Sequence, residues 1–255
     1  MEMELRQVSC GYVGKAIVSD VSLTVRSGDL LCLLGPNGVG KTTLFKSILG
    51  LHPIMSGSIR LDGEDVRHWR RRRFALAVGY VPQGHIPPFP FKVLDVVVMG
   101  RAAHFGAFSA PNRTDFAVAE DSLTAVGLPH LRDAVYTEIS GGERQLVLIA
   151  RALAQRLAFL FMDEPTANLD YGNQIRILDH IRALTGQGLG VVMTTHNPND
   201  ALLYASDVAI LESGGSLVAG KPDTVITEAL LDRLYGVDIR LMPIDGRTAR
   251  ICVPR

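Results

Sequence analysis

Eight consecutive residues, GPNGVGKT at positions 35–42, form the pattern G-x-x-x-x-G-K-[ST]. The apolar run DLLCLLG before them predicts a buried strand, and KTTLFKSILG after them predicts a helix that ends at Gly50. Glycines let backbone N–H groups turn inward around phosphates. Lys41 can bring a positive charge to the β- and γ-phosphates, and the Thr42 hydroxyl can bind Mg²⁺. We therefore predict a phosphate cradle, formed by Gly35, Pro36, Asn37, Gly38, Val39, Gly40, Lys41, Thr42 and Thr43.

Hydrolysis of a bound nucleotide also needs a metal ligand and a group that acts on the attacking water. The segment LAFLFMDEP ends a predicted strand with two carboxylates, so Asp163 is expected to hold Mg²⁺ through its water shell and Glu164 to polarise the water. His196, which ends VVMTTH, can reach the γ-phosphate, and Gln83, which ends VGYVPQ, can bind Mg²⁺ or orient the water. All of these residues follow predicted strands at the edge where open parallel sheets bind ligands, which predicts one composite site.

Two further features fit nucleotide chemistry. Tyr12 follows the first predicted strand and can stack on adenine. Ser140, Gly141 and Gly142 lead into an apolar helix, and backbone N–H groups at such a helix start suit a phosphate. Ser140 and Glu143 also fit the S-x-x-E capping box, which explains the helix start without any ligand. The capping box does not explain two consecutive glycines, which weaken a helix start unless the backbone must come close to something.

The elements that position these residues follow from the hydrophobic pattern. Continuous apolar strands alternate with helices, which predicts an α/β fold with a mostly parallel sheet. Further strands are expected at residues 75–83, 156–165 and 189–198, with a hairpin at 207–220 that turns at Gly214-Gly215. Two helical segments with no strong strand between them predict a helical insertion after Gly84. The tail is expected to form one helix at 223–236 and a hairpin that turns at Asp245-Gly246.

Composition narrows the class of protein. The 255 residues carry 26 Lys plus Arg and 26 Asp plus Glu, and this balance removes the default reason to expect a nucleic-acid partner. Cys10, Cys32 and Cys252 lack metal-ligand spacing and are expected to be buried or incidental thiols. No signal peptide or membrane-spanning run is found, so we predict a soluble, cytoplasmic chain. The basic run RHWRRRR at 67–73 fits a solvated surface, or contact with anionic lipid or a membrane partner.

Five motifs, GPNGVGKT, VGYVPQ, ISGGERQ, LFMDEPTANLD and TTH, occur in the order that resembles the ATP-binding subunit of ABC transporters. The resemblance implies a P-loop NTPase core with an antiparallel β portion, a single domain over residues 1–255 and a helical subdomain at about 84–150 inserted in the RecA-like core. It implies ATP and Mg²⁺ as ligands and a head-to-tail homodimer. Ser140, Gly141, Gly142 and Glu143 would then cap the γ-phosphate of the partner subunit's ATP, while Asn168 and Asp170 would cross the interface.

Two residues depart from the usual family pattern, because Ile139 stands where Leu is common and Glu143 where Gln is common. The segment FPFKVLDVVVMGRAAHFGAFSAPNRTD is similar to ATPases of importers for iron-siderophores, haem, cobalamin and, in some members, molybdate or tungstate. That similarity implies two multi-span permease subunits, a substrate-binding protein and a peripheral location on the inner face of the cell membrane. It leaves the cargo open. The alternatives are a non-transport ATPase of the same class, in cofactor assembly or nucleic-acid work, and a regulatory module that binds ATP without hydrolysis.

Overall fold

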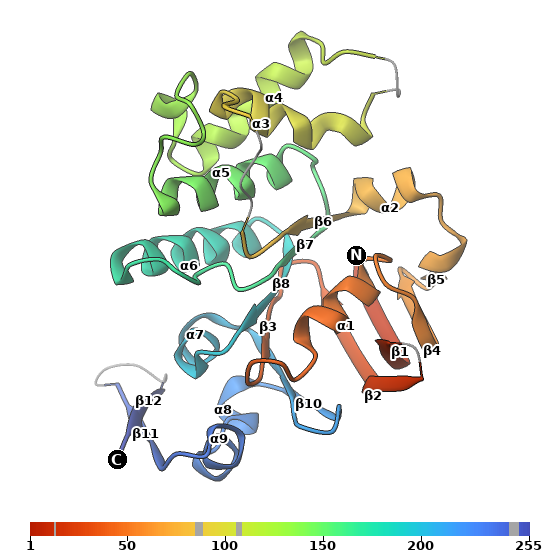
Figure 1. Ribbon diagram of the computed structural model, residues 1–255, viewed down its shortest axis with the longest axis vertical. Helices are drawn as coiled ribbons and strands as arrows, with labels where there is room; N and C mark the ends of the chain where they lie inside the picture. The colour runs from red at the N-terminus through yellow and green to blue at the C-terminus, as the bar shows by residue number, and fades with distance from the viewer. Residues whose placement is uncertain (13, 85–88, 106–108, 245–249) are drawn as a thin grey trace. The chain divides into compact units, whose positions relative to one another are not determined.

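The structure is a computed structural model that describes residues 1–12, 14–84, 89–105, 109–244 and 250–255. The chain forms two compact units, shown in Figure 1. The first unit combines Met1–His68 with Leu184–Arg255, and the second is Trp69–Ala183. Each unit is described by itself. The predicted domain boundaries, a single domain over 1–255 with a helical subdomain at about 84–150, stay a prediction.

The first unit holds most of the strands. Its elements are β1 (Glu2–Tyr12), β2 (Lys15–Arg26), β3 (Leu30–Leu34), α1 (Lys41–Ile48), β4 (Ile54–Leu61), β5 (Glu64–Asp65), η1 (Val66–His68), β8 (Gly190–Thr195), α7 (Pro198–Tyr204), β9 (Asp207–Leu211), β10 (Leu217–Gly220), α8 (Pro222–Val225), α9 (Glu228–Tyr235), β11 (Ile239–Pro243) and β12 (Arg250–Pro254). The second unit contains α2 (Arg71–Ala77), β6 (Val78–Val81), α3 (Val93–Val98), η2 (Met99–Ala103), α4 (Arg113–Ala125), η3 (Pro129–Leu131), α5 (Gly141–Leu153) and β7 (Phe159–Met162). Helix α6 (Tyr171–Gly186) begins in the second unit and ends in the first.

The first unit contains a four-stranded sheet, four strands of a second sheet and the two-stranded pair β11–β12. Strands β2, β1, β4 and β5 form an antiparallel sheet in that order. Strand β3 lies between β8 and β9 and is parallel to both, while β10 runs antiparallel to β9 at the edge. All residues of β3 and β8 are buried, as expected for parallel strands covered on both faces. The register pairs Leu34 with Thr195, so the cradle and His196 both begin where neighbouring strands end.

The second unit joins a parallel strand pair to a helical bundle. Strands β6 and β7 pair in parallel, with Val81 opposite Met162. Helices α3, α4 and α5 pack against one another, as Figure 1 shows. The Arg101 guanidinium holds them together from inside, because its Nε donates to Asp115 Oδ1 at 3.0 Å and its Nη1 donates to the Ala154 carbonyl at 2.8 Å. Both partners of this ion pair are buried.

Two expected elements were placed wrongly. Residues 75–83 do not form one strand, because residues up to Ala77 belong to α2 and only Val78–Val81 is extended. The residues of α2 are mostly good helix formers, and strand geometry begins at the β-branched Val78. The tail helix is also divided in two. Ile226 is fully buried and extended, and Thr227 then caps the new helix α9 by accepting a hydrogen bond from the Leu230 N–H.

Other expectations for the elements are confirmed. The hairpin β9–β10 turns through Gly214 and Gly215, both with positive φ. Strands β11 and β12 pair antiparallel as a hairpin, although its predicted turn at Asp245-Gly246 lies outside the described residues. Cys10 and Cys32 are buried free thiols. Among the described residues, none of the helices combines the length and apolar character needed to span a membrane.

Replacing Arg101 by alanine should destabilise the helical part of the second unit. The change leaves the Asp115 carboxylate buried without its ion-pair partner, and breaking a buried pair in this way costs about 3 to 5 kcal/mol. Urea denaturation of the full chain, followed by circular dichroism, measures the loss. Arg132→Ala is the matched control, because the Arg132–Glu120 ion pair is exposed and should contribute about 1 kcal/mol or less. Equal losses for both variants would contradict a structural role for the buried pair.

Candidate nucleotide-binding site

The cradle loop connects β3 to α1 with the geometry that its glycines predict. Gly38 and Gly40 have φ of 79° and 117°, values that favour glycine. A Cβ on Gly40 would also lie 2.7 Å from Ile17 Cγ2 of β2, so strand packing requires glycine there as well. The loop ends at the N-terminus of α1, where backbone N–H groups and the helix dipole favour a phosphate. Local geometry therefore fits the predicted phosphate cradle.

The Lys41 ammonium lies inside this loop. Its Nζ donates to the carbonyl oxygens of Gly35 at 2.6 Å and Pro36 at 3.1 Å, and the residue is only 6% exposed. The structure thus holds a buried positive charge at the centre of the cradle. Thr42 is exposed and Thr43 is buried, both in the first turn of α1.

His196 follows β8 as predicted, next to the strand that leads into the cradle. Its side chain is exposed. Its backbone carbonyl accepts a hydrogen bond from Tyr235 Oη at 2.9 Å, and this contact was not foreseen from the sequence.

Tyr12 lies at the end of β1 rather than after it, and 58% of its surface is exposed. One side of its ring faces His52, with the ring centroids 5.0 Å apart and a tilt of 52°. The His52 imidazole in turn shares a hydrogen bond with the Gly11 carbonyl through Nε2. An exposed aromatic ring supported on one side is suited to stacking on a base.

Three predicted residues of the second unit also lie beyond strand ends. Gln83 follows β6 by two positions, and Asp163 directly follows β7. The Asp163 N–H donates to the Val81 carbonyl at 2.9 Å, which joins the two strand ends. Gln83 Nε2 donates to Glu164 Oε2 at 3.1 Å. The parallel pairing of β6 and β7 therefore brings together the amide and the carboxylate that the sequence assigns to water and metal chemistry.

Glu164 and Asn168 have an unusual backbone conformation. Their φ values are 44° and 60°, in the left-handed region that non-glycine residues rarely adopt. Such backbone strain concentrates at functional sites. The Glu164 carbonyl accepts a hydrogen bond from the Ala167 N–H at 3.0 Å, which closes a tight turn after the strand.

The glycine turn before α5 contains the predicted capping box. Ser140 N–H donates to Glu143 Oε2 at 2.8 Å, and Glu143 N–H donates to Ser140 Oγ at 3.3 Å. Hydrogen bonding to the Glu143 carboxylate, first from the Ser140 side chain and then from the Ser140 backbone N–H, lowers the pKa of Glu143 below its ordinary value. The carboxylate of Glu143 therefore serves to start the helix, as the capping interpretation predicts.

Gly142 comes close to a residue of its own chain. A Cβ on Gly142 would lie 2.7 Å from Asn173 Cγ, whereas a Cβ on Gly141 would meet Leu169 Cδ2 at an ordinary 3.6 Å. Asn173 Nδ2 donates to Asp170 Oδ2 at 2.6 Å, and the Asn173 N–H donates to Asp170 Oδ1 at 2.9 Å. The backbone hydrogen bond from Asn173 is the largest cause of the lowered pKa of Asp170. The glycine turn therefore lies beside the segment from Asn168 to Asp170. Asn173, which belongs to none of the predicted motifs, contacts both.

Replacing Gly142 by alanine should destabilise the second unit, because the new methyl group would overlap Asn173. Because the overlapping atoms are the end of the Asn173 side chain, the cost should lie at the lower end of overpacking, about 1 kcal/mol, measured by thermal unfolding. Gly141→Ala is the control and should be close to neutral. The double variant Gly142→Ala, Asn173→Ala should recover part of the loss, since it removes the overlapping side chain. Failure of Asn173→Ala to restore any stability would mean that Gly142 is glycine for a reason other than this contact.

The arginine side chains of the basic run at 67–73 are exposed, and several of them contact neighbouring residues. Arg67 Nη2 contacts Asp65 Oδ2 at 2.6 Å, which lowers the pKa of Asp65 to about 2. Arg72 Nε donates to the Ala103 carbonyl at 2.8 Å, and the Arg73 guanidinium lies 3.7 Å from the centre of the Trp69 ring. These contacts fit the interpretation of the run as a solvated surface.

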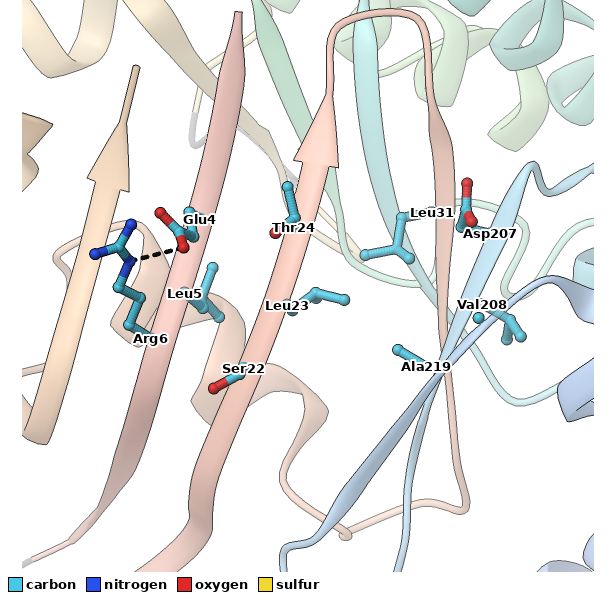
Figure 2. A pocket seen from close by; sticks show the side chains of 11 residues that line it. Glu4, Leu5, Arg6, Ser22, Leu23, Thr24, Leu31, Asp207, Val208 and Ala219 are labelled. Carbon is cyan, nitrogen blue, oxygen red and sulfur yellow. Dashed lines mark ion pairs between the residues drawn. The ribbon is translucent and has the colours of Figure 1, made fainter. Parts of the chain in front are cut away.

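Figure 2 shows a groove in the first unit. Its lining residues come from β1, β2, β3, β9 and β10, and none belongs to a predicted nucleotide motif. The charged groups that line it are paired, Glu4 with Arg6 at 2.7 Å and Asp207 with Lys221 at 3.0 Å. We assign no role to this groove.

The family model described as ABC transporter matches residues 18–167, and the chain belongs to that family. The hemin import ATP-binding protein HmuV of Rhodococcus jostii is 35% identical over 95% of this chain and 82% of its own length. The manganese transport system ATP-binding protein MntB of Bacillus subtilis is 36% identical over 92% of both chains. A solved metal-chelate type ABC transporter in an inward-facing conformation has a TM-score of 0.87 at 30% identity, covering 99% of this chain and 97% of the solved one.

These similarities confirm three expectations from the sequence. The resemblance to ABC ATP-binding subunits holds over nearly the whole chain. The fold class is confirmed as α/β with parallel strands, antiparallel sheet and helical part. The chain is an ATP-binding subunit of an ABC transporter, and hydrolysis of ATP is its reaction.

Proposed function

We propose that this ATPase powers an importer of a metal chelate, with haem and iron-siderophores as the first candidates. The main support is the buried Lys41 in its glycine cradle, together with relatives named for hemin and manganese import and a structural neighbour of metal-chelate type. Cobalamin and oxyanions such as molybdate are the other cargoes implied by the subgroup resemblance. The subunit does not recognise the cargo itself in this proposal.

The cradle is assigned to the triphosphate of ATP. Its N–H groups and Lys41 Nζ would bind phosphate oxygens, since Lys41 is already directed at the centre of the loop. Tyr12 would stack on adenine with the face that His52 leaves open. His196 would hydrogen-bond the γ-phosphate.

Magnesium is the proposed metal, and the oxygen-rich donors suit it. Thr42, Gln83 and Asp163 offer a hydroxyl, an amide oxygen and a buried carboxylate, the ligand types that Mg²⁺ prefers. When bound, Mg²⁺ would offset the negative charge of the phosphates. Glu164 is the proposed base that takes a proton from the attacking water, and Gln83 holds its carboxylate through the hydrogen bond at Oε2.

The partners are inferred from the family. A second copy of the chain would form a head-to-tail homodimer, in which Ser140, Gly141, Gly142 and Glu143 act on the ATP of the partner subunit and Asn168 and Asp170 cross the interface. Two multi-span permease subunits and a substrate-binding protein would complete the importer. The subunit would then lie on the cytoplasmic face of the membrane, attached through the permeases. No nucleic-acid partner is proposed.

The test is purification of the chain from its native membranes in mild detergent, followed by reconstitution in vesicles. A co-purifying multi-span subunit and ATP-dependent uptake of labelled haem, iron-siderophore or manganese would support the importer and identify its cargo. Vesicles with the Glu164→Gln subunit are the matched control and should show no uptake. Recovery of the chain only with soluble partners would reject the importer and favour a non-transport ATPase of the same class.

A further inference from the structure

His196 is held by the elements that follow it in the chain. The hydroxyl of Tyr235, the last residue of α9, donates to the His196 carbonyl oxygen at 2.9 Å. Burial raises the pKa of Tyr235 well above its ordinary value, with further contributions from Cys252 and Asp200. The phenol therefore keeps its proton at every physiological pH and remains a donor to this carbonyl.

The residues on either side of His196 are fixed by one buried carboxylate. Thr195 Oγ1 donates to Asp200 Oδ2 at 2.7 Å, and Asn197 Nδ2 donates to Asp200 Oδ1 at 3.0 Å. The Asn197 N–H also donates to Thr195 Oγ1 at 3.0 Å. Asp200 is 7% exposed, and burial raises its pKa. The two neighbours of His196 are therefore held through Asp200, and the hydrogen bond from Tyr235 adds a contact at the carbonyl of His196 itself.

The helix that carries Asp200 is itself attached to the C-terminal hairpin. Asn199 of α7 uses both ends of its side-chain amide, because Nδ2 donates to the Cys252 carbonyl at 3.2 Å and Oδ1 accepts from the Cys252 N–H at 2.7 Å. The hairpin is attached in turn to α9, because the Ile239 N–H donates to Asp232 Oδ1 at 2.8 Å. Hydrogen bonds thus join the elements that carry Tyr235, His196 and Cys252 to one another within the first unit.

We propose that Tyr235 is a positioning residue for hydrolysis, which sets the orientation of His196 toward the γ-phosphate through the hydrogen bond to its carbonyl. The inference rests on the role assigned to His196 in the proposed function. The proposal gives the C-terminal segment after β10 a role in ATP turnover. ATP binding should depend much less than turnover on this hydrogen bond, because the cradle and Tyr12, which would provide most of the contacts to ATP, lie on other elements of the first unit.

The test compares Tyr235→Phe with the unmodified full-length chain. The variant removes one hydroxyl and keeps the ring, so kcat should fall about threefold to tenfold, the range that one hydrogen bond supplies. The dissociation constant for ATP, measured by titration calorimetry, should change by less than about twofold. Arg233→Ala on the same helix is the matched control, because it removes only the exposed ion pair with Glu212 and should leave kcat unchanged.

A double-variant cycle separates positioning from a general loss of structure. If Tyr235 acts through His196, then Tyr235→Phe should have no further effect on kcat in a His196→Ala background. A full additional loss in that background would overturn the inference, as would an unchanged kcat in the single variant. Wild-type turnover by His196→Ala would overturn the role of His196 itself. The importer proposal is tested separately by vesicle uptake, so its failure is distinguishable from either result.

Discussion

Replacement of Glu164 by glutamine is expected to slow ATP turnover about 100-fold or more, the loss typical for removal of a general base. Glutamine has nearly the same shape but cannot accept a proton from water. In the unmodified chain Gln83 Nε2 donates to the Glu164 carboxylate at 3.1 Å. The amide oxygen of glutamine at position 164 should still accept this hydrogen bond, so the local structure should be retained. Phosphate release by the full chain gives the rate.

ATP binding by Glu164→Gln should persist, and the variant should accumulate as a closed dimer when ATP is present. Light scattering with and without ATP measures the dimer, and calorimetry measures binding. Glu138→Gln is the matched control, because Glu138 is an exposed acid outside the assigned site and should behave as wild type. Phosphate release by Glu164→Gln at the wild-type rate would reject Glu164 as the base.

Replacement of Lys41 by alanine should weaken ATP binding about tenfold to 100-fold. A hydrogen bond to a charged group contributes about 1.5 to 3 kcal/mol, and each 1.4 kcal/mol is a factor of about ten in affinity. The alanine variant lacks the ammonium that now bridges the carbonyls of Gly35 and Pro36. Titration calorimetry with ATP measures the change.

Lys46→Ala is the control for this experiment, because Lys46 is exposed on the same helix α1 and should not affect nucleotide binding. Circular dichroism must show that Lys41→Ala remains folded, since the substitution leaves the buried carbonyl of Gly35 and the half-buried carbonyl of Pro36 without the ammonium. Wild-type affinity in a folded Lys41→Ala chain would contradict the assignment of residues 35–43 to the triphosphate.

The sequence was most informative where a function depends on neighbouring residues. The cradle is a strand, a glycine loop and a helix in direct succession, so its pattern can be read locally, and Gly40 and Lys41 adopt the expected geometry. The strand ends that carry Asp163 and His196 were also predictable, because buried parallel strands are continuous apolar runs. The boundary of β6 was not, since α2 runs directly into it at Val78.

Other features depend on contacts between distant residues, which a single sequence does not reveal. The left-handed backbone of Glu164 is local, in a turn that the Ala167 N–H closes, but it conflicts with the preference of the residue type and so gives no signal in the sequence. The contact of Gly142 with Asn173 and the hydrogen bond from Tyr235 to His196 join segments about 30 to 40 positions apart. Of these, only Gly142 gave a signal in advance, since two consecutive glycines at a helix start indicate a close approach.

The burial of Lys41 also has a consequence for the response to salt. An exposed cation attracts ATP through solvent, and added ions screen that attraction within about 10 Å at 0.1 M ionic strength. A cation that is 6% exposed inside its loop is shielded from those ions and interacts through a medium of lower effective dielectric constant. The part of ATP affinity that Lys41 supplies should therefore change little between low and physiological ionic strength. The contribution of Lys41 to nucleotide occupancy would then depend on the concentration of ATP and little on the concentration of monovalent salt.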